Sequence, residues 1–154
     1  MTYHYPSWDE LPTIELYLDQ VLLYVNQVTQ NNISSGKGLT ASMVNNYVKH
    51  AQLTKPMKKK YNRKHLARLI AITALKNVFS IQEISQTLAI LTANGQSQQS
   101  YDSFVACMNN QEKEELPKII ISACQTLKLY DQTQQLVQNL EGEQDESNAN
   151  HETE

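Results

Sequence analysis

The sequence has little glycine and proline and no long apolar run, and each shortage excludes a class of protein. Four glycines and four prolines among 154 residues disfavour a sandwich of short strands and favour helices. The longest apolar stretch, Leu69 to Leu75, is far shorter than the roughly 20 residues that span a bilayer. The N-terminus lacks the cationic start and apolar core of a signal peptide. We therefore expect a soluble, cytoplasmic, all-α protein with one compact domain or slightly more.

Residues that bind metals or perform catalysis are also scarce. Cys107 and Cys124 show no close pairing and no metal-ligand spacing, so they predict thiols kept reduced. The histidines offer no i, i+4 pair and no neighbouring cysteine, which argues against a metal site built from His4, His50, His65 and His151. A Gly-rich phosphate loop, a nucleophile elbow and an H-E-x-x-H motif are all missing from the sequence. We expect neither an enzyme nor a bound cofactor.

Acidic residues are absent from the middle of the chain, between Asp19 and Glu83. Residues 37–76 hold ten of the 13 lysines and arginines, whereas residues 77–154 hold 12 acidic and three basic residues. Solvated surfaces normally mix both signs, so a segment of one sign favours an anionic partner. The ten cations are Lys37, Lys49, Lys55, Lys58, Lys59, Lys60, Arg63, Lys64, Arg68 and Lys76.

Apolar spacing predicts a series of helices. The first runs from Pro12 and Thr13 to about residue 32, and a flexible loop follows at 33–38. Thr40 is placed to cap a short helix at 41–50, and TKPMKKK after Leu53 predicts a protruding loop or small wing. Asn62 can cap a central helix that is apolar nearly all round, and Ser80 with Glu83 forms a capping box for a fourth helix.

The C-terminal part is expected to be simpler. Residues 93–100 read as a linker, and helices are predicted over about 101–110 and 116–140. The stretch 141–154 has six carboxylates and no apolar residue larger than alanine, so we expect it to be disordered. The resulting division is a helical domain at 11–92, a helical extension at 101–140 and an acidic tail at 141–154.

The short helix and the lysine-rich loop have the chemistry of a DNA-binding surface. Asparagine can donate to and accept from adenine in the major groove, while lysine suits phosphates because an ammonium needs no defined base partner. Residues 3, 4 and 7 apart project from one side of the helix at 41–50. The candidate DNA-binding residues are Ser42, Asn45, Asn46, Lys49, Lys55, Lys58, Lys59, Lys60, Arg63, Lys64 and Arg68.

Two strings carry a family resemblance: TASMVNNYVKHAQL, and KPMKKKYNRKHLARLIAITALKNVFSIQEI. They resemble the DNA-binding half of the MerR superfamily, with Val44, Tyr47 and Leu53 on matching positions and FSIQEI opening the fourth helix. This resemblance implies a MerR-like winged helix-turn-helix. The chain departs from that pattern because Asn45 replaces the arginine of the recognition helix and Ala51 replaces its closing glycine. No segment obviously matches the long dimerisation helix or the sensor cysteines.

A narrower resemblance rests on four blocks: LPTIELYLDQ, LTASMVNNYVKH, KPMKKKYNRKHL and LKNVFSIQEI. In this order and spacing, over about residues 11–120, they are similar to the bacterial family called domain of unknown function 1836. This resemblance implies a MerR-like helical fold, to which the helices expected at 101–140 add a C-terminal extension, but it brings no known activity.

These observations predict a transcriptional regulator that binds double-stranded DNA, probing the major groove with the helix at 41–50. Because such folds read paired half-sites, we expect a homodimer, with residues 116–140 as the interface. The alternative is a protein- or RNA-interaction module that uses the same basic face without enzymatic activity. A further hypothesis is that the acidic tail folds back over the basic face and competes with DNA.

Overall fold

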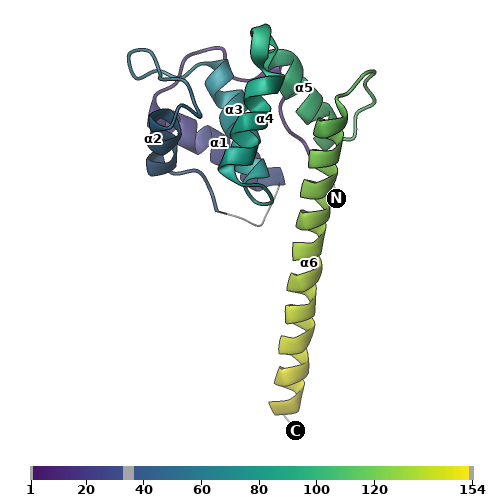
Figure 1. The fold of residues 1–154 in the computed structure, drawn as a ribbon. Helices are drawn as coiled ribbons and strands as arrows, with labels where there is room; N and C mark the ends of the chain where they lie inside the picture. Colours follow the sequence, from purple (N-terminus) through teal and green to yellow (C-terminus); the bar gives the residue numbers. More distant parts are fainter. Residues whose placement is uncertain (1, 33–36, 153–154) are drawn as a thin grey trace.

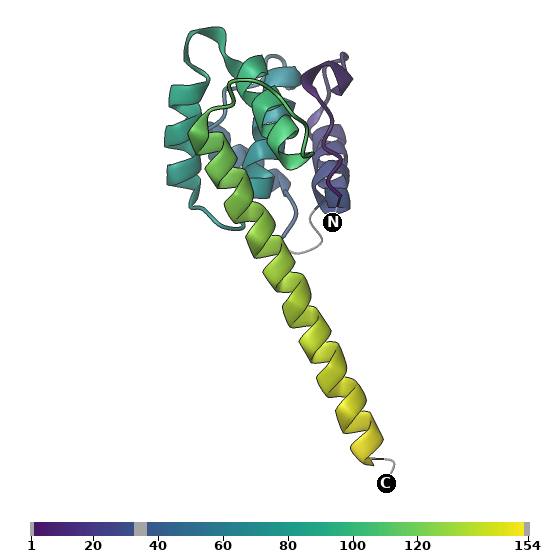
Figure 2. The same cartoon turned by 90° about the vertical axis from the view of Figure 1, so that its right-hand side faces the viewer.

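The computed structural model describes residues 2–32 and 37–152, with side chains placed over 2–32 and 37–146. The expected loop at 33–38 therefore falls largely outside the described residues. Helices α1 to α5 form a compact head, from which α6 extends as a long straight helix (Figures 1 and 2). The described residues contain no strand beyond two isolated bridges, which confirms the all-α expectation. The helices are α1 (Leu18–Asn32), α2 (Ala41–Lys49), α3 (Arg63–Leu75), α4 (Ile81–Leu91), α5 (Ser97–Met108) and α6 (Lys118–Glu152), with 3-10 turns η1 (Trp8–Glu10) and η2 (Ala93–Gly95).

The head is built around α3. Nine of the 13 residues of this helix are buried, and Leu66, Leu69, Ile70 and Ile72 have no exposed surface at all. Helices α1, α4, α5 and α6 all pack against it. An apolar surface on every side suits a helix surrounded by neighbours, so the expected central helix is confirmed.

Three helix starts follow the capping chemistry of the sequence. The Thr40 hydroxyl accepts the Met43 N–H at 3.2 Å, and the Asn62 side chain accepts the His65 N–H at 3.3 Å. At α4, the Ser80 hydroxyl accepts the Glu83 N–H at 3.1 Å and the Glu83 carboxylate accepts the Ser80 N–H at 3.0 Å. Each bond satisfies a backbone donor that the helix leaves without a partner.

Two boundaries differ from the sequence prediction. Helix α1 begins at Leu18 rather than near Pro12, because Leu16 is held extended by paired backbone bonds to Tyr61 of 2.9 and 2.8 Å. Ile14 is consequently 76% exposed instead of facing the core. The stretch 93–100 is only partly a linker, since η2 ends at Gly95 and α5 already begins at Ser97.

The N-terminal segment before α1 is part of the core. Tyr3, Tyr5 and Leu11 are at most 3% exposed, and the Tyr5 ring meets the Phe104 ring edge-on at 5.4 Å between centroids. The Asn109 side chain, at the end of α5, bonds both backbone groups of Tyr5, at 2.8 and 2.9 Å. These contacts hold the N-terminal segment against α5.

Only the first part of α6 packs against the head. Ile120, Cys124, Leu127 and Asp131 are buried at a 4-3-4 spacing, whereas every side chain from Leu136 to Glu146 is exposed. The helix continues to Glu152, although the sequence predicts disorder over 141–154. Extending an existing helix adds one hydrogen bond per ordered residue, and glutamate and glutamine are good helix formers. Among the described helices, none has both the length and the hydropathy that a membrane crossing requires.

Candidate nucleic-acid interface

Helix α2 presents a polar face to solvent. Val44 and Tyr47 point into the core, with exposed fractions of 0% and 9%. The opposite side carries the exposed residues Ser42, Asn45, Asn46 and Lys49. The two asparagines therefore lie where a partner can reach them, as the sequence predicts.

The approach to α2 is held by a side chain of α1. The Asn26 amide donates to the Leu39 carbonyl at 2.9 Å and accepts the Leu39 N–H at 2.7 Å. Gly38 fits beside it because a Cβ there would lie 2.7 Å from the Asn26 oxygen. From the C-terminal end of α3, the Lys76 ammonium donates to the Gly38 carbonyl at 3.3 Å, and burial lowers the pKa of this lysine. These contacts fix the start of α2 relative to α1 and α3.

The end of α2 is closed without glycine. Ala51 adopts a left-handed conformation, φ 57°, at the point where helices commonly place glycine. The N–H groups of Gln52 and Leu53 then bond the Tyr47 carbonyl at 2.8 and 3.1 Å. The chain thus leaves α2 in a defined direction toward the lysine-rich segment.

Residues 55–60, which we call the basic loop, form a tight turn that projects from the head (Figure 1). Lys58 and Lys59 both have positive φ, 51° and 64°, and the Lys60 N–H bonds the Met57 carbonyl at 2.9 Å. Two central residues with positive φ define the type I′ turn of tight hairpins. The side chains of Lys55, Lys58, Lys59 and Lys60 are exposed, and the Lys60 ammonium lies 5.7 Å from the centre of the Tyr17 ring. The protruding loop expected from the sequence is confirmed.

His65 joins the two ends of this loop, a role that sequence reasoning missed. Its Nδ1 accepts the Asn62 N–H at 3.0 Å, so the proton lies on Nε2, which donates to the Thr54 carbonyl at 3.1 Å. The side chain is 4% exposed, and burial lowers the pKa of the imidazole, with weaker opposing effects from Thr54 and Glu15. The available signal was its place three residues after the Asn62 cap, where a capping-box side chain stands.

Two of the predicted DNA contacts are already engaged with the protein itself. One guanidinium nitrogen of Arg63 donates to the carbonyls of Asp9 and Leu11, at 3.3 and 3.2 Å. Arg68 Nε donates to the Gln52 carbonyl at 2.8 Å, and both arginines are only partly exposed. The other nine predicted residues are exposed: Ser42, Asn45, Asn46, Lys49, Lys55, Lys58, Lys59, Lys60 and Lys64.

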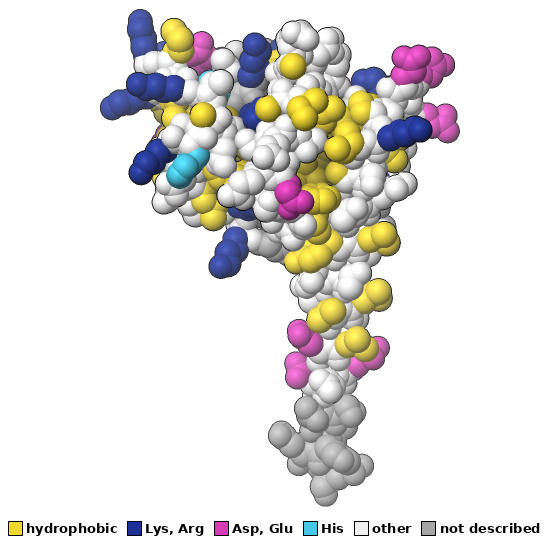
Figure 3. Space-filling view, viewed as in Figure 1, with side chains coloured by type: hydrophobic (Ala, Val, Ile, Leu, Met, Phe, Trp, Pro, Cys, Tyr) yellow, Lys and Arg dark blue, Asp and Glu magenta, His cyan; other side chains and the backbone are white. Residues whose placement is uncertain are grey.

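Basic side chains are unevenly distributed over the face of the molecule drawn in Figure 3. Figure 3 shows lysine and arginine side chains gathered on the side of the head formed by α2 and the basic loop. Acidic side chains of the described tail residues lie along α6, which leads away from that side (Figures 1 and 3). The hypothesis that the tail folds back over the basic face is therefore not supported, because residues 141–146 belong to the projecting helix.

A family model described as "Domain of unknown function (DUF1836)" matches residues 6–104. The chain belongs to this family. In this member of the domain of unknown function 1836 family, the match includes α2, the basic loop and α3, and it ends within α5. No curated protein and no solved structure matches the chain. Within the described part of this family member, no group of three or more His, Cys, Asp or Glu could hold a metal ion.

Proposed function

We propose that the protein is a DNA-binding transcriptional regulator with a MerR-like winged helix-turn-helix, in which α2 enters the major groove and the basic loop acts as the wing. One observation carries the proposal: α2, which exposes Asn45 and Asn46, and the lysine-rich turn lie at the same end of the head (Figure 1), where basic side chains gather (Figure 3). An α-helix fits the major groove, and asparagine amides can pair with an adenine edge there.

The exposed cations supply the sequence-independent part of this binding. Residues 20–82 contain no aspartate or glutamate, so no acidic residue is interspersed in the sequence among the exposed lysines of this segment. The six proposed to contact DNA are Lys49, Lys55, Lys58, Lys59, Lys60 and Lys64. If these six lysines each neutralise one phosphate, the logarithm of the affinity falls with the logarithm of salt concentration at a slope of roughly −5. Asn45 and Asn46 then supply selectivity rather than affinity.

A second copy of the chain is the partner that would complete a paired DNA site. Within residues 116–140, α6 carries an exposed stripe at alternating spacings of 3 and 4, the spacing of a coiled-coil seam, and four of its seven residues are large and apolar. The stripe consists of Ile119, Ser122, Thr126, Leu129, Thr133, Leu136 and Leu140. Lys118 and Lys128 lie near the start of α6, whereas Glu141, Glu143, Asp145 and Glu146 lie near its end. This polarity favours an antiparallel pair of α6 helices, in which opposite charges meet.

The test of DNA binding uses the geometry of the basic loop. Replacing Lys58→Asn together with Lys59→Gly removes two charges and installs the sequence that the type I′ turn prefers, so weaker binding cannot be assigned to a damaged turn. Fluorescence anisotropy with random duplex DNA across a salt series should show the slope reduced by about 2. Lys113→Glu is the matched control, because it changes the net charge equally on the loop between α5 and α6. An equal loss in both variants would refute a specific role for the basic loop.

The selectivity test concerns α2. Asn45→Ala and Asn46→Ala should each reduce the preference for a selected motif, by about 1–3 kcal/mol for each base that is no longer recognised, while binding to random DNA persists. Competition with transfer RNA and heparin separates the alternative, a protein- or RNA-interaction module. If all polyanions compete equally and no DNA motif can be selected, the regulator proposal fails.

A further inference from the structure

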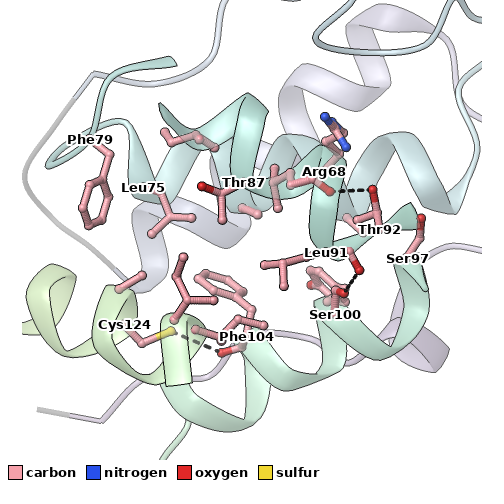
Figure 4. Close-up of a pocket in the computed structure, with 18 of the residues that line it drawn as sticks. Arg68, Leu75, Phe79, Thr87, Leu91, Thr92, Ser97, Ser100, Phe104 and Cys124 are labelled. Carbon is pink, nitrogen blue, oxygen red and sulfur yellow. Dashed lines mark hydrogen bonds between the residues drawn. The ribbon is translucent and has the colours of Figure 1, made fainter. Parts of the chain in front are cut away.

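A groove opens in the head on the side of α3 that faces α4, α5 and α6. Its volume is about 550 Å³, within the range of small-molecule sites. Figure 4 shows side chains from these helices converging on it from several directions. The groove also reaches Leu53 and Thr54, the residues that lead from α2 to the basic loop, and Ile119 of α6.

The walls over most of the groove are apolar. Leu75 and Phe79 lie at one end, and Leu91 and Phe104 line the part nearest α5 (Figure 4). Ile84, the buried residue of α4, completes this lining. Such a surface suits a hydrocarbon chain or ring, whose transfer from water contributes roughly 25 cal/mol for each Å² buried.

The other end of the groove is polar and positively charged. Arg68 lies there together with Thr92, Ser97 and Ser100, and Lys64 also belongs to the lining (Figure 4). The hydroxyls of Thr92 and Ser100 already donate to the Leu88 and Leu91 carbonyls, at 2.6 and 2.7 Å. The unused donors at this end are therefore the Ser97 hydroxyl and those of the cations.

The positive charge of Arg68 has no carboxylate partner among the described residues, although the Glu83 side chain also lines the groove. Arg68 Nε donates to the Gln52 carbonyl at 2.8 Å, which leaves the two terminal nitrogens of the guanidinium for a ligand. Burial lowers the pKa of Arg68, and no carboxylate offsets that effect among the described residues. A planar guanidinium with two parallel N–H donors matches the two oxygens of a carboxylate.

We propose that this groove binds an amphipathic monocarboxylate, with its apolar body between Phe79 and Phe104 and its carboxylate on Arg68. The ligand spans the polar and apolar ends that the groove combines, and it is distinct from any DNA partner. It would touch both the segment that carries the basic loop and the helix proposed to pair two chains. Ligand binding is measured without DNA, so its failure and the failure of the DNA proposal are distinguishable.

Three probes with the same apolar chain and different head groups test the charge preference: decanoate, decanol and decyltrimethylammonium. Trp8, the only tryptophan, lies 6.4 Å from Tyr101 between ring centres, and Tyr101 lines the groove. Titration followed by Trp8 fluorescence and by calorimetry should give decanoate an affinity at least about tenfold higher than decanol, since hydrogen bonds to charged groups are the stronger ones. Decyltrimethylammonium should bind more weakly still. Equal binding of decanoate and decanol, or no binding of either, would overturn the proposal.

Two pairs of variants locate the site. Thr87→Phe places a ring in the groove and should abolish decanoate binding, whereas the neighbouring Gln86→Phe adds the same ring at an exposed position outside the groove and should not. Arg68→Gln should weaken decanoate about tenfold and leave decanol unchanged. Arg68→Lys keeps the charge and should retain part of the preference, which separates charge recognition from loss of the Gln52 bond. If Thr87→Phe instead dissociates a dimer and the native chain binds no decanoate, a second copy occupies the groove and the proposal is wrong.

Discussion

Tyr3 and Tyr5 are two buried tyrosines near the N-terminus. Removing the hydroxyl group should lower the free energy of unfolding at Tyr3 but not at Tyr5. The Tyr3 hydroxyl donates to a carboxylate oxygen of Asp131 at 3.0 Å, and the exposed fractions are 2% for Tyr3 and 0% for Asp131. The Tyr5 hydroxyl is also buried but has no hydrogen-bond partner among the described residues. The other Asp131 oxygen is likewise buried and has no partner among the described residues. The bond from the Tyr3 hydroxyl is therefore the one hydrogen bond that the structure gives this carboxylate.

The magnitudes follow from what each substitution leaves behind. Tyr3→Phe strands a buried carboxylate, which should lower the free energy of unfolding by about 2–3 kcal/mol. Tyr5→Phe removes a hydroxyl that was dehydrated without compensation, so the free energy of unfolding should stay unchanged or rise by up to about 1 kcal/mol. For a chain of this size, the difference of about 2–4 kcal/mol corresponds to melting temperatures roughly 4–16 °C apart.

Urea unfolding monitored by Trp8 fluorescence measures both variants under one set of conditions. The urea dependence of the unfolding free energy should match in the two, since neither change alters the surface exposed on unfolding by much. Comparable destabilisation by both substitutions, or a larger loss from Tyr5→Phe, would show that the Tyr3–Asp131 bond does not stabilise the N-terminal segment as described.

Three further outcomes are expected. Burial lowers the pKa of His65 in the folded protein, so the unfolded chain binds the proton more readily. The contribution of neutral His65 to the free energy of unfolding should therefore be complete above the ordinary imidazole pKa of about 6.5 and be lost as the pH falls through the lower folded pKa. Unfolding measured at several pH values should show a smaller decline for His65→Gln, and an unchanged decline would refute the assignment. Gly38→Ala should lower the free energy of unfolding, measured by thermal denaturation, by about 1–2 kcal/mol, because the added Cβ would lie 2.7 Å from the Asn26 oxygen. An unchanged free energy would mean that the segment before α2 can shift to accommodate the Cβ. Leu129→Asp on the exposed stripe of α6 should halve the mass measured by light scattering without lowering the melting temperature of the monomeric head, whereas a native chain that is already monomeric would exclude the pairing of α6 helices.

The elements that the sequence predicted well are those with local causes. Thr40, Asn62 and Ser80 start their helices through bonds that reach only three residues along the chain, and such bonds can be identified from spacing. The beginning of α1 could not be identified this way, because Leu16 pairs with Tyr61, a residue distant in the sequence. The length of α6 was also missed, since its exposed second half is governed by helix propensity and not by burial.

In the candidate interface, too, the features with local causes were predictable and those with tertiary causes were not. Exposure of Asn45 and Asn46 followed from the periodicity of α2, because Val44 and Tyr47 define its buried side. Sequence reasoning treated every cation of the basic segment as a surface charge, and it could not distinguish Arg68 from its neighbours. Arg68 is partly buried because it bonds Gln52 across a tertiary contact, and the groove beside it involves helices from α3 to α6. Neither relation leaves a local pattern.

The scarcity of glycine has a consequence for engineering the protein. Among the residues that the structure describes, six other than glycine occupy left-handed backbone conformations: Ala51, Lys58, Lys59, Asn94, Asn110 and Glu115. For residues other than asparagine, this geometry costs roughly 1–2 kcal/mol. Ala51→Gly or Glu115→Gly would relieve backbone strain at an exposed turn, so one or two substitutions should give a protein of higher thermal stability. At Lys58 and Lys59 the same relief would remove charge, and selection for thermal robustness alone would erode the basic loop.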